Sequence, residues 1–369
     1  MIKRTVEISR EAAHVSLKHD QIVLRRGDAI VATIPSEDLG ILVVDHPQTT
    51  FSAAALARIS EQGGVVVLCD RSHLPMSALI PYTRHTELVW RFQDQLDATV
   101  PIRKRLWGQI VAAKIHAQAE LLDRNSRAFR KLKALAAAVK SGDSGAAEAQ
   151  AARIFWANWL TSHLPPDDRQ QRDPEFCPGT EPGYDRPLIA PRLPCDTLRT
   201  AGYDDFPDAA VSDYYDETGT PGESLDETGL RETARCFRRD PDGTGLNAFL
   251  NYGYAILRAS TARALVSAGL NPAIGIQHAN RSNPYGLADD VMEPLRPLVD
   301  RRVRHLWCEQ GRRTLDPATK THLLETLSAT VRFEGQNGPL MVVLHRYVNS
   351  FLRCLKKTEP KIVFPKMIE

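Results

Sequence analysis

The 369-residue sequence has no apolar run approaching the roughly 18 residues that a membrane-spanning helix needs. Its start, MIKRTVEIS, has no apolar signal-peptide core, so a cytoplasmic location without a membrane partner is expected. The six cysteines, at positions 69, 177, 195, 236, 308 and 354, include no CxxC pair, which argues against a zinc site and a disulfide framework. The chain is long enough for two domains.

Lysine is absent from residues 165–235, which hold 17 acidic residues, 7 arginines and 10 of the 24 prolines. Their net charge of −10, subtracted from +2 for the whole chain, leaves +12 on the remainder. An acidic stretch rich in proline and glycine is typical of an insertion that is loop-like or poorly ordered. The basic remainder is compatible with a phosphate-backbone partner, but many solvated protein surfaces are basic as well.

Short alternating runs of apolar and polar residues over positions 4–45 predict strands and hairpins. The segment TTFSAAALARISEQGG predicts a helix with Ser52 as its cap and Gly63-Gly64 as its stop. VVVLCD follows as a buried strand, and LPMSALIP as a further short strand or loop. Residues 1–87 are therefore predicted to form a small β-rich domain.

From about residue 88 the apolar residues recur with the helical period. The tail, residues 360–369, is expected to be a peripheral extension. Amphipathic or basic helices are predicted over residues 86–100, 101–125, 127–143, 141–160, 246–269, 300–314, 316–334 and 338–357.

Two of these helices carry candidate site residues. Glu148 lies in the first turns of the helix at 141–160, among alanines that would let a ligand or another backbone come close. A glutamate there also complements the helix dipole, so both interpretations stay open. Asn247, Asn251 and Arg258 share one face of the helix at 246–269. They predict contact with phosphate or with an active-site loop, against the alternative of solvent exposure or interhelical hydrogen bonds.

The stretch 271–300 combines a lone histidine with three acids. His278 ends an apolar run and precedes a loop rich in glycine, proline and asparagine. Asp289, Asp290 and Glu293 follow in helical register, and Pro294 and Pro297 end or kink that helix. An imidazole and carboxylates brought together can hold Mg²⁺ or Mn²⁺. The alternative is a core histidine beside acids that cap a helix.

Several segments, taken together and in order, resemble the CRISPR-associated endonuclease and spacer integrase called Cas one, in its type II form. The resemblance rests on the combination of a Glu-Ala helix, an Asn-rich helix, and a segment in which a histidine, a loop and LADDxxEP follow one another. The departure is the acidic insertion at about 165–235. The matching stretches are TIPSEDLG, VVVLCD, LWGQIVAAKIHAQA, EAQAARIFW, GLNAFLNYGYAILRA, GIQHANRSNPYGLADDVMEPLRPLVD and VNSFLRCL.

The resemblance implies an α+β protein, with a small N-terminal β-sandwich-like domain (1–87) for dimerisation and partner contact. A larger all-α catalytic domain (88–369) would follow. Glu148, His278 and Glu293 would be the catalytic residues and would ligate one Mg²⁺ or Mn²⁺. Asp290, Asn247 and Asn251 would support them. Candidate DNA-backbone contacts, chosen on charge, are Lys114, Arg153, Arg239, Arg258 and Arg281.

The resemblance further implies that the protein inserts short duplex DNA, the protospacer, into the CRISPR repeat by attack of a 3′-hydroxyl on a phosphodiester. Its partners would be double-stranded DNA, a second copy in a homodimer, and the small subunit Cas two in a heterohexamer. The type II RNA-guided effector nuclease is a further candidate partner. The alternatives are a structure-specific nuclease for branched DNA and a catalytically silent DNA-binding assembly subunit.

Overall fold

The computed structural model describes residues 3–71, 73–81, 86–161, 233, 237–240, 243–278 and 283–368. These residues belong to one compact unit built from the chain segments 1–163 and 221–369. Apart from Thr233, the insertion at 165–235 lies outside the described residues, and so does Arg281. Among the described residues, no helix is long and apolar enough to cross a membrane.

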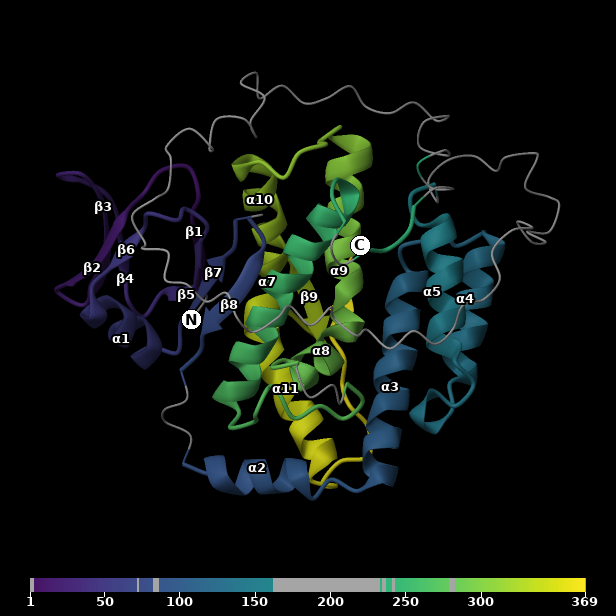
Figure 1. Ribbon diagram of the computed structural model, residues 1–369. Coiled ribbons are helices and arrows are strands. Elements are labelled where there is room, and N and C mark those ends of the chain that lie inside the picture. The colour runs from purple at the N-terminus through teal and green to yellow at the C-terminus, as the bar shows by residue number, and fades with distance from the viewer. Residues whose placement is uncertain are drawn as a thin grey trace, which may run out of the picture. The chain divides into compact units, whose positions relative to one another are not determined.

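The described N-terminal strands form two four-stranded sheets (Figure 1). In the first sheet β1, β5 and β7 are parallel and β8 is antiparallel to β7. The second sheet has the order β4-β3-β2-β6. The strands of the first are β1 (Arg4–Ile8), β5 (Leu39–Val44), β7 (Val65–Cys69) and β8 (Pro75–Leu79). Those of the second are β2 (His14–Lys18), β3 (Gln21–Arg26), β4 (Ala29–Pro35) and β6 (Thr50–Phe51).

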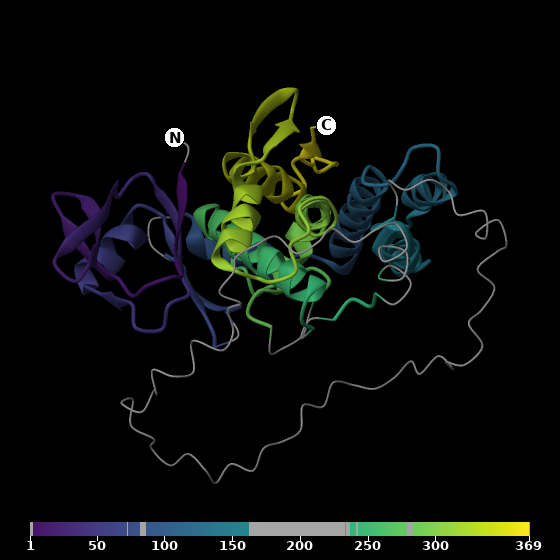
Figure 2. The same cartoon turned by 90° about the horizontal axis from the view of Figure 1, so that it is seen from above.

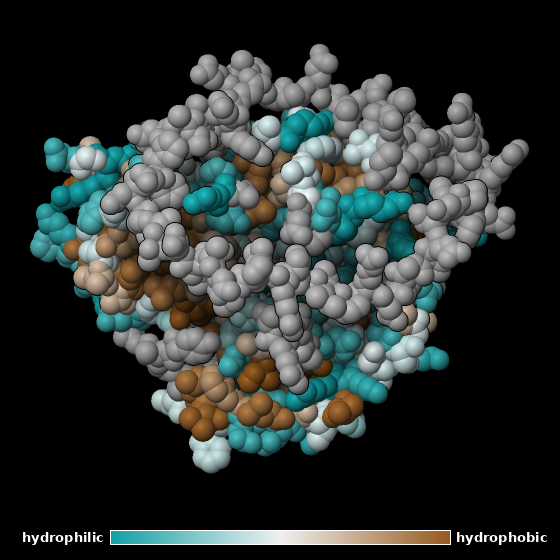
Figure 3. Space-filling model, in the orientation of Figure 1, coloured by the Kyte–Doolittle hydropathy of each residue, from teal (hydrophilic) through white to brown (hydrophobic). Residues whose placement is uncertain are grey.

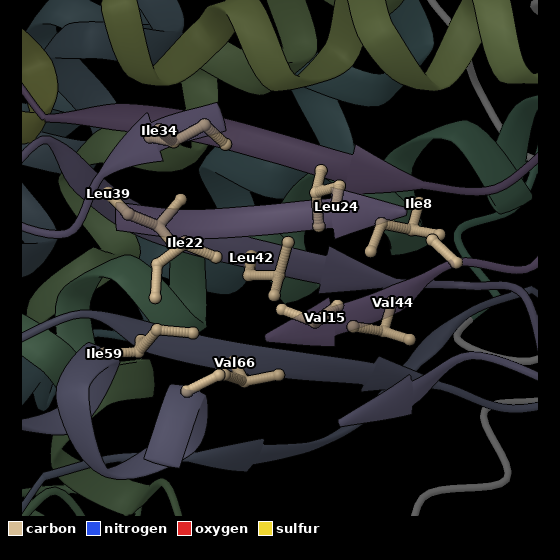
Figure 4. Close-up of a cluster of buried hydrophobic side chains, with 12 residues drawn as sticks. Ile8, Val15, Ile22, Leu24, Ile34, Leu39, Leu42, Val44, Ile59 and Val66 are labelled. Atoms are coloured by element: carbon tan, nitrogen blue, oxygen red, sulfur yellow. The ribbon is translucent and has the colours of Figure 1, made fainter. Parts of the chain in front are cut away.

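Apolar side chains from both sheets form one buried cluster (Figure 4). Helix α1 (Ala53–Glu61) closes this core with Ile59. Its N-terminus is capped by Ser52, whose Oγ accepts a hydrogen bond from the N–H of Ala55, and Gly63 follows its end with a φ of +69°, as predicted. The cluster includes Ile8, Val15, Ile22, Leu24, Ile34, Leu39, Leu42, Val44, Ile59 and Val66.

The helical part is centred on α7 (Leu246–Ser267), most of whose side chains are buried. Helices α3 (Val100–Ala119), α4 (Arg127–Ala138) and α5 (Ala147–Asn158) pack on one another, and they lie side by side in both Figure 1 and Figure 2. The other described α-helices are α2 (Leu88–Leu96), α8 (Gly286–Met292), α9 (Arg296–Arg304), α10 (Pro317–Leu324) and α11 (Leu340–Leu355).

Helix α2 turns much of its apolar side to solvent, where Val89, Trp90 and Leu96 are all exposed. Figure 3 shows apolar side chains gathered where α2 lies. Its buried residue is the polar Gln95, whose Oε1 accepts from the N–H of Asn271 at 2.7 Å and whose Nε2 donates to the carbonyl of Asn271. Helix α2 therefore holds the start of the segment that leads to His278.

The helix predicted across 316–334 is wrong in its last part. Thr330–Phe333 is strand β9, paired antiparallel with β10 (Gln336–Pro339) and with β11 (Lys366–Met367) from the tail. The tail is therefore part of a sheet. Along β9 buried and exposed residues alternate with the period of a strand, a signal too short to outweigh the preceding helical pattern. The α+β class is as predicted, but the helical part includes this small sheet.

Buried charges join the N-terminal sheets to the helices. Lys320 of α10 is completely buried, and its Nζ lies 2.5 Å from Oδ2 of Asp45, just after β5. Nδ1 of His73 lies 2.9 Å from the other oxygen of Asp45. The hydroxyl of Tyr252 in α7 donates to Oε1 of Glu7 in β1 at 3.3 Å. A buried charge is tolerated only when it is paired in this way.

Glu7 should make the stability of the protein depend on pH. Burial raises the pKa of Glu7 to about 7 from 4.5, and Asp45 adds to this shift while Lys320 opposes it. As the pH rises, the unfolded chain loses the Glu7 proton at a lower pH than the folded protein does. The free energy of unfolding therefore falls as the pH rises from about 4.5 through 7. We expect Glu7 to account for at most about 3 kcal/mol of this fall.

Urea unfolding at pH 5 and pH 8 measures this effect. In Glu7→Gln the difference in free energy of unfolding between the two pH values should be smaller than in the wild type. Part of it should remain, because burial also raises the pKa of Asp300 to about 7. An unchanged pH dependence would contradict the assignment.

Candidate active site

Glu148 lies in the first turn of α5, which a tight turn before the helix positions. Ala146 adopts a left-handed φ of +50°, and the carboxylate of Asp143 accepts hydrogen bonds from the N–H groups of Ala147 and Glu148. Asp143 therefore caps the N-terminus of the helix. The Glu148 side chain is 28% exposed and its Oε1 accepts a hydrogen bond of 2.6 Å from Lys114. Glu148 thus contacts a partner outside its own helix.

The ammonium of Lys114 lies between two carboxylates. Lys114 comes from α3 and its side chain is only 14% exposed. Its Nζ is 2.6 Å from Oε1 of Glu148 and 2.5 Å from Oε2 of Glu293. Lys114 is predicted from the sequence as a DNA-backbone contact, and in the structure its ammonium is engaged inside the site. Two of the predicted catalytic residues, far apart in the chain, therefore converge on one positive centre.

Glu293 stands at a change of helix geometry. It begins a short 3-10 turn, Glu293–Leu295, between α8 and α9, where Pro294 breaks the regular helix as predicted. Oε1 of Glu293 pairs with Nε of Arg296 at 2.8 Å, and the side chain is 5% exposed. Burial by itself would raise the pKa of Glu293, but Arg296 and Lys114 lower it to about 2. Glu293 is therefore an ionised carboxylate.

His278 is held by Asp290. One carboxylate accepts hydrogen bonds from the N–H groups of Ile276, Gln277 and His278, and Oδ1 lies 2.6 Å from Nδ1 of the imidazole. The hydrogen bond to Asp290 raises the pKa of His278, although burial opposes it. Since Nδ1 faces a carboxylate it carries the proton, which leaves Nε2 of the neutral ring as a lone-pair donor. The ring of Trp107 packs edge-on against this imidazole, with centroids 5.8 Å apart.

Two glycines let the His278 loop run against α8. A Cβ on Gly275 would lie 2.5 Å from the carbonyl oxygen of His278 and 2.9 Å from Oδ2 of Asp290. A Cβ on Gly286 would lie 2.6 Å from the same carbonyl. Either substitution would push the loop away, because the nearest contacts include backbone atoms. The close approach keeps the three N–H groups within reach of Asp290.

Asn247 and Asn251 of α7 together hold Arg239. Their Oδ1 atoms accept hydrogen bonds from its guanidinium at 3.0 and 2.5 Å. Arg239 lies over the ring of Tyr254, 5.3 Å from its centroid, and Arg296 lies over the same ring at 4.7 Å. The two asparagines therefore fix a cation next to the one that pairs with Glu293.

The other described residues predicted to contact DNA differ in the exposure of their side chains. Arg153 is exposed on α5. Arg258 is 38% exposed, and its Nε donates to Oδ1 of Asp289 at 2.6 Å. The other carboxylate oxygen of Asp289 accepts a hydrogen bond of 2.8 Å from Nδ2 of Asn283.

The donor chemistry of the site suits a divalent cation. Two carboxylate oxygens converge on one positive centre, and the ring nitrogen of His278 that faces away from Asp290 is a further donor. Asp290 stands behind that ring as a carboxylate typically stands behind a metal-bound histidine. Within the part of the chain that the structure describes, no three His, Cys, Asp or Glu side chains are already grouped to hold a metal ion.

The sequence alone did not identify Arg296 as a residue of the site, nor the contacts of Lys114 with the two glutamates. Arg296 follows Glu293 by three residues, the spacing that brings side chains together on a helix, so the sequence did contain a signal. The contact of Lys114 with Glu148 and Glu293 joins α3, α5 and the turn after α8. No local spacing could reveal it.

Comparison with known proteins identifies the family of this chain. The family model described as CRISPR associated protein Cas1 matches residues 6–163 and 212–319. A CRISPR-associated endonuclease Cas1 of Neisseria meningitidis is 30% identical over 341 residues, covering 91% of this chain and 87% of that protein. Another from Saccharolobus solfataricus is 25% identical over 299 residues, covering 80% and 73%. The matched relatives are thus CRISPR-associated endonucleases. This chain belongs to the Cas1 family, as the sequence motifs predict.

Solved structures agree in fold. A Cas1 protein from Thermotoga maritima aligns with a TM-score of 0.60 at 14% identity, covering 97% of this chain and 99% of that one. A casposase bound to an integration product aligns with a TM-score of 0.64 at 15% identity, covering 97% and 92%. The likeness confirms the α+β fold of Cas1 proteins.

Proposed function

We propose that this protein is the metal-dependent DNA integrase and endonuclease of CRISPR adaptation, which joins the 3′-hydroxyl of a short DNA duplex to a phosphodiester of the CRISPR repeat. The observation that carries the proposal is the convergence of Glu148 and Glu293 on one positive centre. Membership of the Cas1 family and the fold shared with a casposase bound to an integration product support it.

Glu148, Glu293 and His278 are the residues that would hold a divalent cation, Mg²⁺ or Mn²⁺. When bound, that cation would stabilise charge on the attacked phosphodiester and favour the ionised form of the attacking hydroxyl. No nucleophile from the protein is required, because one phosphodiester is exchanged for another. With water in place of the hydroxyl, the same site would cleave DNA.

The neighbouring residues orient these ligands. Arg296 takes one oxygen of Glu293 and so turns the other toward Lys114 and Glu148. Asp290 fixes the tautomer of His278 and the path of its loop, which directs Nε2 away from Asp290. Ligands held in place before binding lose less freedom when the complex forms.

Double-stranded DNA, both protospacer and repeat, is the proposed substrate. The net charge of +12 outside residues 165–235 favours a phosphate backbone, and DNA binding should weaken steeply as salt rises. Among the candidate contacts that the structure describes, Arg153 is exposed, and Arg258 is partly exposed and paired with Asp289. The small subunit Cas2 is a proposed partner, because a Cas6-RT-Cas1–Cas2 complex contains the same fold, with a TM-score of 0.61 at 19% identity over 97% of this chain and 35% of that one. A homodimer is proposed on the sequence resemblance alone. The type II effector nuclease is proposed on the sequence resemblance alone.

A half-site integration assay with purified DNA and Mn²⁺ tests the proposal. Glu148→Ala and His278→Ala should each lower strand transfer by about a thousandfold, since a metal ion supplies several kcal/mol of charge stabilisation. DNA binding at low salt should stay close to that of the wild type, because neither residue is a cation that contacts phosphate.

Glu120→Ala is the matched control, since Glu120 is a more exposed glutamate that pairs with Lys133. It should retain full activity. Full integration by Glu148→Ala or His278→Ala would refute the assignment. Cleavage of branched DNA without dependence on a repeat would indicate a structure-specific nuclease instead. Binding without any product under Mg²⁺ or Mn²⁺ would indicate a silent assembly subunit.

A further inference from the structure

We infer that Lys114 is the resident counter-ion of the active site, which holds Glu148 and Glu293 together in the metal-free protein and leaves the space between them when a divalent cation binds. The inference rests on the proposed function, because it places that cation between the same two carboxylates. It adds a positioning role for a lysine that the sequence suggested only as a DNA contact.

The geometry makes the ammonium necessary in the absence of metal. Its Nζ is within 2.6 Å of both carboxylates, so the two oxygens must lie close to each other. Glu293 is nearly inaccessible, and its two carboxylate oxygens pair with Lys114 and Arg296. Two partly buried carboxylates at short range repel each other strongly unless a positive charge separates them. Lys114 supplies that charge.

The same geometry makes the ammonium a competitor of the metal. A cation that binds both Oε1 of Glu148 and Oε2 of Glu293 needs the position that Nζ occupies. Lysine can withdraw, because its charge sits at the end of a flexible four-carbon stem. Arg296 differs, since it pairs with the opposite oxygen of Glu293 and is packed over the ring of Tyr254. Arg296 can therefore remain in place while Lys114 moves.

Lys114→Met tests the inference, because methionine keeps much of the length of the side chain and removes the charge. In EDTA the melting temperature should fall by several degrees relative to the wild type. Mn²⁺ should bind about tenfold more tightly by calorimetry, and it should raise the melting temperature of the variant more than that of the wild type. The larger metal-induced shift is the result that a merely structural lysine would not give.

Lys133→Met is the matched control. Lys133 also pairs with a glutamate, Glu120, at 2.7 Å, but both side chains are more than a third exposed. Neither the melting temperature in EDTA nor Mn²⁺ affinity should change. If Lys114→Met does not fold, Lys114→Gln keeps a hydrogen-bond donor without the charge, and it should also bind Mn²⁺ more tightly than the wild type.

The outcomes separate this inference from the proposed function. If the wild type binds Mn²⁺ and Glu148→Ala does not, while the Lys114 variants bind it no more tightly than the wild type, the counter-ion role is wrong and the metal site stands. If the wild type and Glu148→Ala bind Mn²⁺ equally, the metal site itself is wrong and the inference falls with it.

Discussion

Glu293→Gln should lower DNA strand transfer by at least about a thousandfold, the largest effect on activity expected of any single isosteric change in this protein. Glutamine has nearly the same shape but no charge, so Lys114 and Arg296 would lose the carboxylate that both contact. A divalent cation would lose its most buried ligand. The loss follows from several kcal/mol of charge stabilisation, with each 1.4 kcal/mol worth about tenfold in rate.

Integration with purified DNA and Mn²⁺ measures this loss, and circular dichroism together with DNA binding shows whether the variant remains folded. Glu309→Gln is a suitable control, because it makes the same change at an exposed glutamate that pairs with His305. Its activity should equal that of the wild type. Strand transfer by Glu293→Gln within tenfold of the wild type would show that this carboxylate has no part in the chemistry.

Asp45→Ala should lower the free energy of unfolding by about 3–5 kcal/mol, the largest expected effect on stability. Lys320 and the Asp45 side chain are both completely buried, with Nζ and Oδ2 2.5 Å apart. Removing the carboxylate leaves a buried ammonium without its partner between the N-terminal sheets and the helices. The hydrogen bond to His73 is lost as well.

Urea unfolding followed by circular dichroism measures this change. The control is Asp94→Ala, which breaks a 3.9 Å ion pair with Lys356 in which both side chains are more than a third exposed, and which should cost less than about 1 kcal/mol. The double variant Asp45→Ala/Lys320→Met should be more stable than Asp45→Ala, because it removes the unpaired charge. A double variant no more stable than the single one would show that the cost arises from lost packing and not from the ammonium.

Much of the architecture could be predicted from the sequence because its signals are local. Alternation over residues 4–45 and the helical period after residue 88 identify the two kinds of structure. Ser52, Gly63 and Pro294 mark ends and breaks of helices through their own backbone preferences. The strand at 330–333 was missed because its four residues follow a long helical pattern without a proline between them.

The candidate site could be predicted only in part. Glu148, His278 and Glu293 can be selected from the sequence because their side chains are able to ligate a metal ion. The family resemblance assigns them a common role. What the sequence could not supply are contacts set by tertiary packing, such as Lys114 with Glu148 and Glu293. Lys320 with Asp45 is of the same kind, since 275 residues separate them. Charge alone suggested that Lys114 faces DNA, because a sequence does not tell a buried lysine from an exposed one.

Asp290 determines both the conformation of the backbone around His278 and the state of the His278 ring. The same carboxylate receives the N–H groups of three consecutive residues and the Nδ1 proton of His278. The backbone conformation of residues 276–278 and the basicity of the His278 imidazole therefore both depend on the Asp290 side chain. A substitution that loosens this segment will therefore also alter how readily His278 gives up its proton.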